Sequence, residues 1–235
     1  MSVDINVHIY CKNIDVSEIL IEKIINSALK TGLEYYRAEG DPPLQNISRI
    51  ISGQHEGFVS FRNEHGTLFS LGFSKESDKP IKGLPELNIT VTAASVGYYD
   101  RATTDKKLLP VYIRNGKIIA QIAKNIWNFL DVKPLFGIGD YETNMWEGAP
   151  ISSVTPADVN KSEVFKKIDL NPCWMNLYGP ELLKKINEKK IMQGMWKTVK
   201  LDRGSMILRE PVPSPSHMPE GYANLDTVKK EFDSL

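Results

Sequence analysis

The sequence predicts an α+β fold in which helices pack on an antiparallel sheet. Two long segments have the apolar spacing of amphipathic helices, and strand-like segments lie between and after them. Runs of strands between helices, without a regular strand–helix alternation, favour antiparallel over parallel pairing. At 235 residues the chain is long enough for one large domain or for two similar halves, 1–110 and 111–235, although no residue-level repeat relates them.

The N-terminal segment predicts a strand followed by a helix. Apolar and polar residues alternate over 3–10, which is typical of a strand with one buried face, and His8 on the polar side is expected to be solvated. A helical apolar stripe then runs through about 16–38. Asp15 is the expected N-cap of this helix, with Glu18 completing a capping-box pattern.

Two hairpins are predicted from turn residues that separate apolar runs. Residues 63–66, Asn-Glu-His-Gly, separate two runs rich in Phe and Leu, and the glycine suits a tight turn. His65 in this turn is expected to be solvated. Residues 202–204, Asp-Arg-Gly, separate two further strand-like runs, and another strand is predicted over 87–94.

The second half of the chain predicts a buried helix over 116–131, because its isoleucines, Trp127 and Leu130 recur at helical spacing. The segment 134–141 is either a short strand or a glycine-bent loop. Its Gly-x-Gly lacks the third glycine of a dinucleotide-binding motif, so we interpret it as a bend that allows close approach of neighbouring backbone. Gly179-Pro180 predicts the start of another helix.

Composition and motifs argue against several functional classes. Lys plus Arg and Asp plus Glu are 29 each, and this zero net charge disfavours direct nucleic-acid binding. No apolar run approaches the ~20 residues of a membrane helix, and the N-terminus lacks a signal-peptide pattern, so we expect a cytoplasmic protein. The two cysteines and four scattered histidines form no metal or nucleophile motif. We therefore predict no catalytic residues, metal or cofactor.

Acidic residues alternate with aromatic residues in two segments that we expect to be loops. Aromatic side chains are favoured anchors at protein interfaces, and carboxylates complement a basic cleft such as that of a nuclease. The alternative is that the aromatic side chains pack inward while the acids are merely solvated. The predicted partner-binding residues are Tyr98, Tyr99, Asp100, Asp140, Tyr141, Glu142, Trp146 and Glu147.

Four blocks of the chain resemble bacterial immunity proteins. These are the opening strand and helix, Trp127–Leu130 with 134–140, Cys173–Leu183, and Arg203–Leu208 with the proline-rich 211–215. They are similar to the immunity family paired with restriction-endonuclease-like toxins of polymorphic and type VI secretion systems. The resemblance implies a non-enzymatic α+β protein that binds its cognate toxin, expected to be a DNase, inside the producing cell and occludes its active site or substrate cleft.

Two other classes remain open from the residues alone. A small enzyme could assemble its site from dispersed residues such as His55, Asp100 and Asp140, because catalytic partners are often distant along a chain. A structural component of a phage or secretion apparatus would instead be expected to self-assemble.

Overall fold

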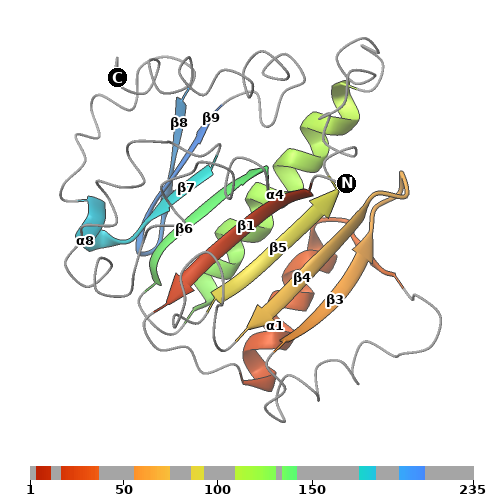
Figure 1. Ribbon diagram of the computed structural model, residues 1–235, viewed down its shortest axis with the longest axis horizontal. Coiled ribbons are helices and arrows are strands. Elements are labelled where there is room, and N and C mark those ends of the chain that lie inside the picture. Colours follow the sequence, from red (N-terminus) through yellow and green to blue (C-terminus); the bar gives the residue numbers. More distant parts are fainter. Residues whose placement is uncertain are drawn as a thin grey trace.

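The chain forms a nine-stranded antiparallel sheet with two long helices on one face (Figure 1). The structure, a computed structural model, describes residues 4–11, 17–36, 56–74, 86–92, 109–130, 134–141, 175–183 and 196–209. The strand order is β2-β3-β4-β5-β1-β6-β7-β9-β8. This arrangement confirms the predicted α+β class.

The elements in chain order are β1 (Asp4–Cys11), α1 (Glu18–Lys30), β2 (Glu34–Tyr35), β3 (Glu56–Arg62), β4 (Leu68–Ser74), β5 (Glu86–Thr92), α4 (Leu109–Phe129), β6 (Pro134–Tyr141), β7 (Met175–Tyr178), α8 (Pro180–Leu183), β8 (Trp196–Leu201) and β9 (Gly204–Arg209).

Strand β1 lies at the centre of the sheet and joins its two sides. It pairs with β5 from Asp4 to Tyr10, and with β6 from Ile5 to Cys11. Since β6 follows residue 110, the sheet is continuous across the boundary between the two predicted halves.

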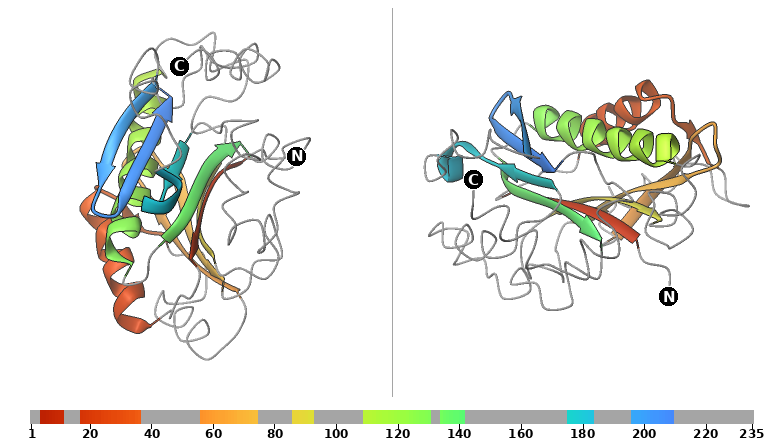
Figure 2. Two further views of the ribbon diagram at one scale, coloured as in Figure 1. Left: turned by 90° about the vertical axis from the view of Figure 1, so that its left-hand side faces the viewer. Right: turned by 90° about the horizontal axis from the view of Figure 1, so that it is seen from above.

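Helices α1 and α4 lie side by side on the same face of the sheet (Figure 2). Their buried residues form one hydrophobic core with Val7 and Ile9 of β1, Phe61 of β3 and Phe69 of β4. Asn125 of α4 also donates a hydrogen bond to Oγ of Ser27 on α1, at 2.6 Å. Because each fully buried aliphatic or aromatic side chain stabilises the fold by about 1.5–3 kcal/mol, this single core is the main source of stability.

The ends of α1 differ from the prediction. Ser17, and not Asp15, is the N-cap, because its hydroxyl accepts a hydrogen bond from the backbone N–H of Leu20 at 3.3 Å. The helix ends at Lys30, eight residues before the predicted end. Gly32 then adopts a left-handed φ of 87°, which redirects the chain into β2.

Helix α4 begins at Leu109, seven residues before the predicted start at Gly116. Pro110 is tolerated because it lies in the first turn, where a backbone N–H would have no acceptor within the helix. The C-terminal half of α4 is held by the β8–β9 turn, which lies next to it on the same face of the sheet (Figure 2). Nε1 of Trp127 donates to the carbonyl oxygen of Arg203 at 2.9 Å, and the N–H of Asp202 donates to Oδ1 of Asn128 at 3.2 Å.

The predicted hairpins at 63–66 and 202–204, the strand near 87–94 and the helix start at Pro180 are all confirmed. Strand β7 had no counterpart in the prediction. All four of its residues, Met-Asn-Leu-Tyr, are buried, and at four residues the strand is at the lower limit of length for which a period-2 pattern can be recognised. The predicted surface segment 142–170 and the predicted final helix 225–233 lie outside the described residues.

The 134–141 segment is a strand and not the glycine-bent loop that the sequence left as the alternative, and its two glycines allow close packing, mainly by side chains of the neighbouring strands. A Cβ added at Gly139 would lie 2.8 Å from Cγ2 of Val7 and 3.2 Å from Cβ of Met175. A Cβ at Gly137 would lie 2.9 Å from Cδ1 of Leu177 and 3.0 Å from the carbonyl oxygen of His8. Neighbouring side chains therefore occupy the space above both glycines.

We expect Gly139→Ala to lower the free energy of unfolding by about 1–3 kcal/mol, because the added methyl group overpacks the contact with β1 and β7. Urea denaturation measures this change. Gly66→Asn is the control, since Gly66 has a φ of 78° that Asn tolerates and nothing lies within 4 Å of its added Cβ. Equal stability of Gly139→Ala and the wild type would contradict the close approach.

Candidate functional site

Most of the predicted partner-binding residues lie outside the described part of the chain. These are Tyr98, Tyr99, Asp100, Glu142, Trp146 and Glu147. Asp140 and Tyr141 are not in a loop as expected, because β6 continues through both and pairs them with Asn6 and Ile5 of β1. Their role in partner binding stays a prediction, as does an enzyme site that uses His55, which also lies outside the described residues.

The expectation that His8 is solvated is wrong. His8 is 3% exposed, and its ring stacks on Tyr10 with centroids 6.2 Å apart, while Tyr10 stacks on Phe136 at 4.8 Å. Asn176 and Tyr178 on β7 are also fully buried. Strand β1 lies at the centre of the sheet, and both of its faces are covered. The polar residues that alternate with apolar ones in its sequence therefore did not mark an exposed face.

The β3–β4 turn is shaped by the side chain of Asn63, which is 6% exposed. Its Oδ1 accepts from the backbone N–H of His65 at 3.0 Å and of Thr67 at 2.9 Å. Gly66, in the left-handed conformation, donates its N–H to the carbonyl oxygen of Asn63 at 2.9 Å. One amide oxygen therefore fixes the backbone on both sides of the turn.

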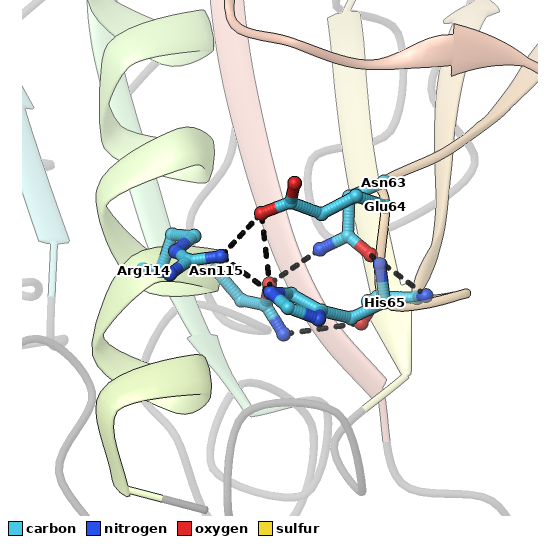
Figure 3. A network of polar contacts seen from close by, with 6 residues as sticks. Asn63, Glu64, His65, Arg114 and Asn115 are labelled. Atoms are coloured by element: carbon cyan, nitrogen blue, oxygen red, sulfur yellow. Dashed lines mark hydrogen bonds and ion pairs between the residues drawn. The ribbon is translucent and has the colours of Figure 1, made fainter.

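The same turn is tied to α4 by a buried amide network (Figure 3). Nδ2 of Asn63 donates to Oδ1 of Asn115 at 2.8 Å, and Nδ2 of Asn115 donates to Oγ1 of Thr67 at 3.2 Å. Asn115 is fully buried and Thr67 is 7% exposed. Since a buried polar group that loses its partner is costly, this network holds the turn in one position on the helix.

The side chains of Glu64, His65 and Arg114 meet beside this network, nearer the solvent (Figure 3). Nη1 of Arg114 contacts Oε1 of Glu64 at 2.5 Å and also contacts Nε2 of His65. His65 Nε2 lies 3.2 Å from Oε1 of Glu64. His65 is exposed, as the sequence predicted. Exposed ion pairs contribute little stability, so these contacts arrange charge without stabilising the turn strongly.

Beside this turn, the β2–β3–β4 end of the sheet carries exposed aromatic, aliphatic and charged side chains, which we call the edge patch: Glu34, Tyr35, Tyr36, Arg62 and Leu68. Four exposed large hydrophobic side chains are found among the described residues, and three belong to the edge patch. Tyr35, Tyr36 and Leu68 are each 38–39% exposed, whereas the fourth, Ile19, lies on α1.

The register of β2, β3 and β4 divides the edge patch between the two faces of the sheet, because Tyr35 pairs with the core residue Phe61 on the helix face. Glu34 pairs with Arg62, and Arg62 pairs with Leu68, so these three residues form one row across the strands. The Arg62 guanidinium lies 3.8 Å from the Glu34 carboxylate. The row lies on the face opposite the helices, because the adjacent row contains the core residues Phe61 and Phe69.

The two tyrosines of the edge patch are held by the same strands. The ring of Tyr35 stacks on Phe61 with centroids 5.4 Å apart. Burial raises the pKa of the Tyr35 hydroxyl, so the phenol is a neutral hydrogen-bond donor at physiological pH. The backbone N–H of Tyr36 donates to the carbonyl oxygen of Ser60 at 3.0 Å. Both side chains therefore project from ordered backbone.

Sequence reasoning missed the edge patch because Glu34, Tyr35 and Tyr36 fell inside the predicted helix 16–38. The pair Thr31-Gly32 was the available signal, since a glycine after a helical stripe commonly marks its C-terminal cap. Arg62 and Leu68 flank a turn that was predicted correctly, but their alignment with β2 depends on long-range pairing.

The described residues include no cluster of three or more His, Cys, Asp or Glu side chains that could hold a metal ion. Among the helices described, none has the length and apolar content needed to cross a membrane. No protein-family model matches the chain. A search of curated proteins also finds no similar sequence.

We expect Asn115→Leu to lower the free energy of unfolding by about 2–3 kcal/mol, because it leaves Nδ2 of Asn63 and Oγ1 of Thr67 without their partner on α4. Chemical denaturation measures the loss. The control is Lys117→Ala on the exposed side of the same helix, with an expected change within about 0.5 kcal/mol. Similar effects of the two substitutions would contradict a structural role for the buried network.

Proposed function

We propose that this protein is a cognate immunity protein that binds a bacterial toxin and neutralises it, with the edge patch at the centre of the contact surface. The proposed toxin is a DNase effector of a type VI or related secretion system that acts in the cytoplasm, where the immunity protein would also work. Binding would occlude the toxin's active site or substrate cleft.

The observation that carries the proposal is that Tyr35, Tyr36 and Leu68, three of the four exposed large hydrophobic side chains among the described residues, belong to the β2–β3–β4 end of the sheet, with Leu68 on the face opposite the helices and Tyr35 beside Phe61 on the helix face. Tyrosine and arginine are enriched at protein interfaces, and energetically dominant residues cluster in such aromatic centres. Arg62 and Glu34 supply paired charge beside the apolar side chains. This is the composition of an apolar interface centre with a polar rim.

Part of the edge patch is held in place by packing and buried hydrogen bonds, which favours tight binding. Tyr35 is stacked on Phe61, and the β3–β4 turn that follows Arg62 is fixed to α4 through Asn63 and Asn115. Because little conformational freedom is lost when a preorganised surface binds, more of the contact energy appears as affinity.

The toxin identity in the proposal rests on the sequence resemblance and not on the edge patch. A stable complex buries at least about 1,200 Å² in total and typically involves about 20–30 residues on each partner, many more than these five. Surrounding surface must therefore contribute, and the predicted acidic and aromatic residues around Asp100 and Asp140 are candidates for that contribution.

The test is co-expression with the product of the neighbouring gene, scored by cell survival and by co-purification. Survival together with a one-to-one complex is the expected result. The double variant Tyr36→Glu/Leu68→Glu should bind at least about 30-fold more weakly, equivalent to losing about 2 kcal/mol at an interface hot spot. Failure of the wild-type protein to rescue cells or form a complex would reject the toxin-binding function.

Ile19→Glu is the matched control for this variant. Ile19 is 65% exposed but lies on α1, so the substitution adds a charge to an exposed apolar position outside the edge patch. We expect it to leave affinity and rescue unchanged. Equal loss of binding in Ile19→Glu and in the double variant, or full binding by both, would exclude the edge patch as the contact centre.

A further inference from the structure

The hydrogen-bond register of β2 leaves one backbone donor and one backbone acceptor at the outer edge of the sheet. The N–H of Tyr36 donates to the carbonyl oxygen of Ser60 at 3.0 Å, so these two residues form a hydrogen-bonded pair. Such pairs alternate with non-hydrogen-bonded pairs along antiparallel strands, and the next pair is Tyr35 with Phe61. The N–H and C=O groups of Tyr35 therefore point away from β3.

The pairing of β3 with β4 gives the same alternation independently. The N–H of Asn63 donates to the carbonyl oxygen of Thr67 at 3.0 Å. Two residues earlier, Phe61 pairs with Phe69, so it directs its own N–H and C=O groups toward β4 and not toward β2. Strand β2 is the last in the strand order, and none of the described strands pairs with its outer side. The backbone of Tyr35 is therefore an open position at the edge of the sheet.

Side chains of the edge patch lie on both faces of the sheet beside this open position. The Tyr35 ring lies on the helix face, where it stacks on Phe61. Glu34 and Tyr36 precede and follow Tyr35, so they lie on the opposite face. A partner surface that contacts one face would reach only part of the edge patch, whereas an extended strand added at the edge places its side chains alternately on both faces.

We propose that the partner protein adds an extended segment to the sheet at β2, with one of its residues hydrogen-bonded to both backbone groups of Tyr35. The inference rests on the proposed toxin-binding function and adds the way in which the partner is recognised. In strand addition, main-chain hydrogen bonds supply affinity and alternate side chains supply specificity.

The edge patch defines the chemistry of the added segment. The partner residue opposite Tyr35 lies on the helix face, where an aromatic or β-branched side chain packs well against the tyrosine ring. The adjacent partner residue, opposite Glu34, is basic, because opposite charges are favoured across neighbouring strands. The Glu34 side chain is 76% exposed, and its carboxylate, 3.8 Å from the Arg62 guanidinium, is open to a second cation.

The small size of β2 favours a different protein, and not a second copy of this chain, as the occupant of the edge. Strand β2 has two residues, and Glu34 and Arg62 place charge beside it. Very short edge strands with charged side chains resist pairing between identical edges. One open residue also offers only one donor and one acceptor, so the added segment needs a partner that brings further contacts to both faces.

The first test separates the backbone of Tyr35 from its ring with the variants Tyr35→Pro and Tyr35→Val. Both remove the ring that stacks on Phe61, but only proline removes the N–H, and proline is tolerated in an edge strand where this group faces solvent. In titrations with the product of the neighbouring gene, we expect Tyr35→Pro to bind at least about 10-fold more weakly than Tyr35→Val, because a partner carbonyl loses its donor. Wild-type amide signals of Asn63 and Thr67 would show that the β3–β4 turn is intact in each variant.

The second test is residue-resolved amide exchange of the wild-type chain by NMR. In the free protein, the amide of Tyr35 should exchange fast and that of Tyr36 slowly, since Tyr36 donates to Ser60. Adding the product of the neighbouring gene should slow exchange at Tyr35.

The outcomes distinguish strand addition from toxin binding. If a complex forms, equal binding by the two variants or unchanged exchange at Tyr35 would each overturn strand addition and leave the toxin-binding function standing. Absence of any complex would reject both. A dimer of the free chain that protects the Tyr35 amide and is lost in Tyr35→Pro would assign the edge to a second copy, and would overturn the inference.

Discussion

The docking of two hairpin turns on helix α4 is the constraint on which the rest of the structure depends. The β3–β4 turn is bonded to Asn115, and the β8–β9 turn is bonded to Trp127 and Asn128. The two turns belong to strands near opposite ends of the strand order. Their contacts on the helix, Asn115 and Trp127, are about 18 Å apart along its axis at 1.5 Å per residue. The helix therefore links the two sides of the sheet through specific hydrogen bonds as well as through the core.

This constraint gives the β2 edge its ordered surface. Strand β2 has only two residues and would be a weak addition to the sheet by itself. It pairs with β3, whose terminal turn is fixed to α4 by buried amide hydrogen bonds, and Tyr35 stacks on the core residue Phe61. The edge patch thus combines exposed aromatic, aliphatic and charged side chains with a support of ring stacking and buried hydrogen bonds.

The sequence was informative where structure is local. Periodicity and turn residues predicted β1, both hairpins and most of α4, because these patterns reflect one buried face and a required backbone conformation. Sequence reasoning failed where burial covers both faces, as at β7 and His8, and where a short strand follows a helix, as at Tyr35. The pairing that aligns Glu34, Arg62 and Leu68 joins distant segments, so no local pattern encodes the edge patch.

Amide hydrogen exchange of the chain, alone and with its proposed toxin partner, tests most directly whether the edge patch is a binding face. We expect the toxin to slow exchange at residues 34–36 and 62–68, because these backbone segments carry or flank the proposed contact centre. Exchange at residues 18–22, around Ile19 on α1, should not change. Protection confined to residues 98–100 and 140–147, with none at 34–36 and 62–68, would contradict the account and return the interface to the acidic and aromatic segments.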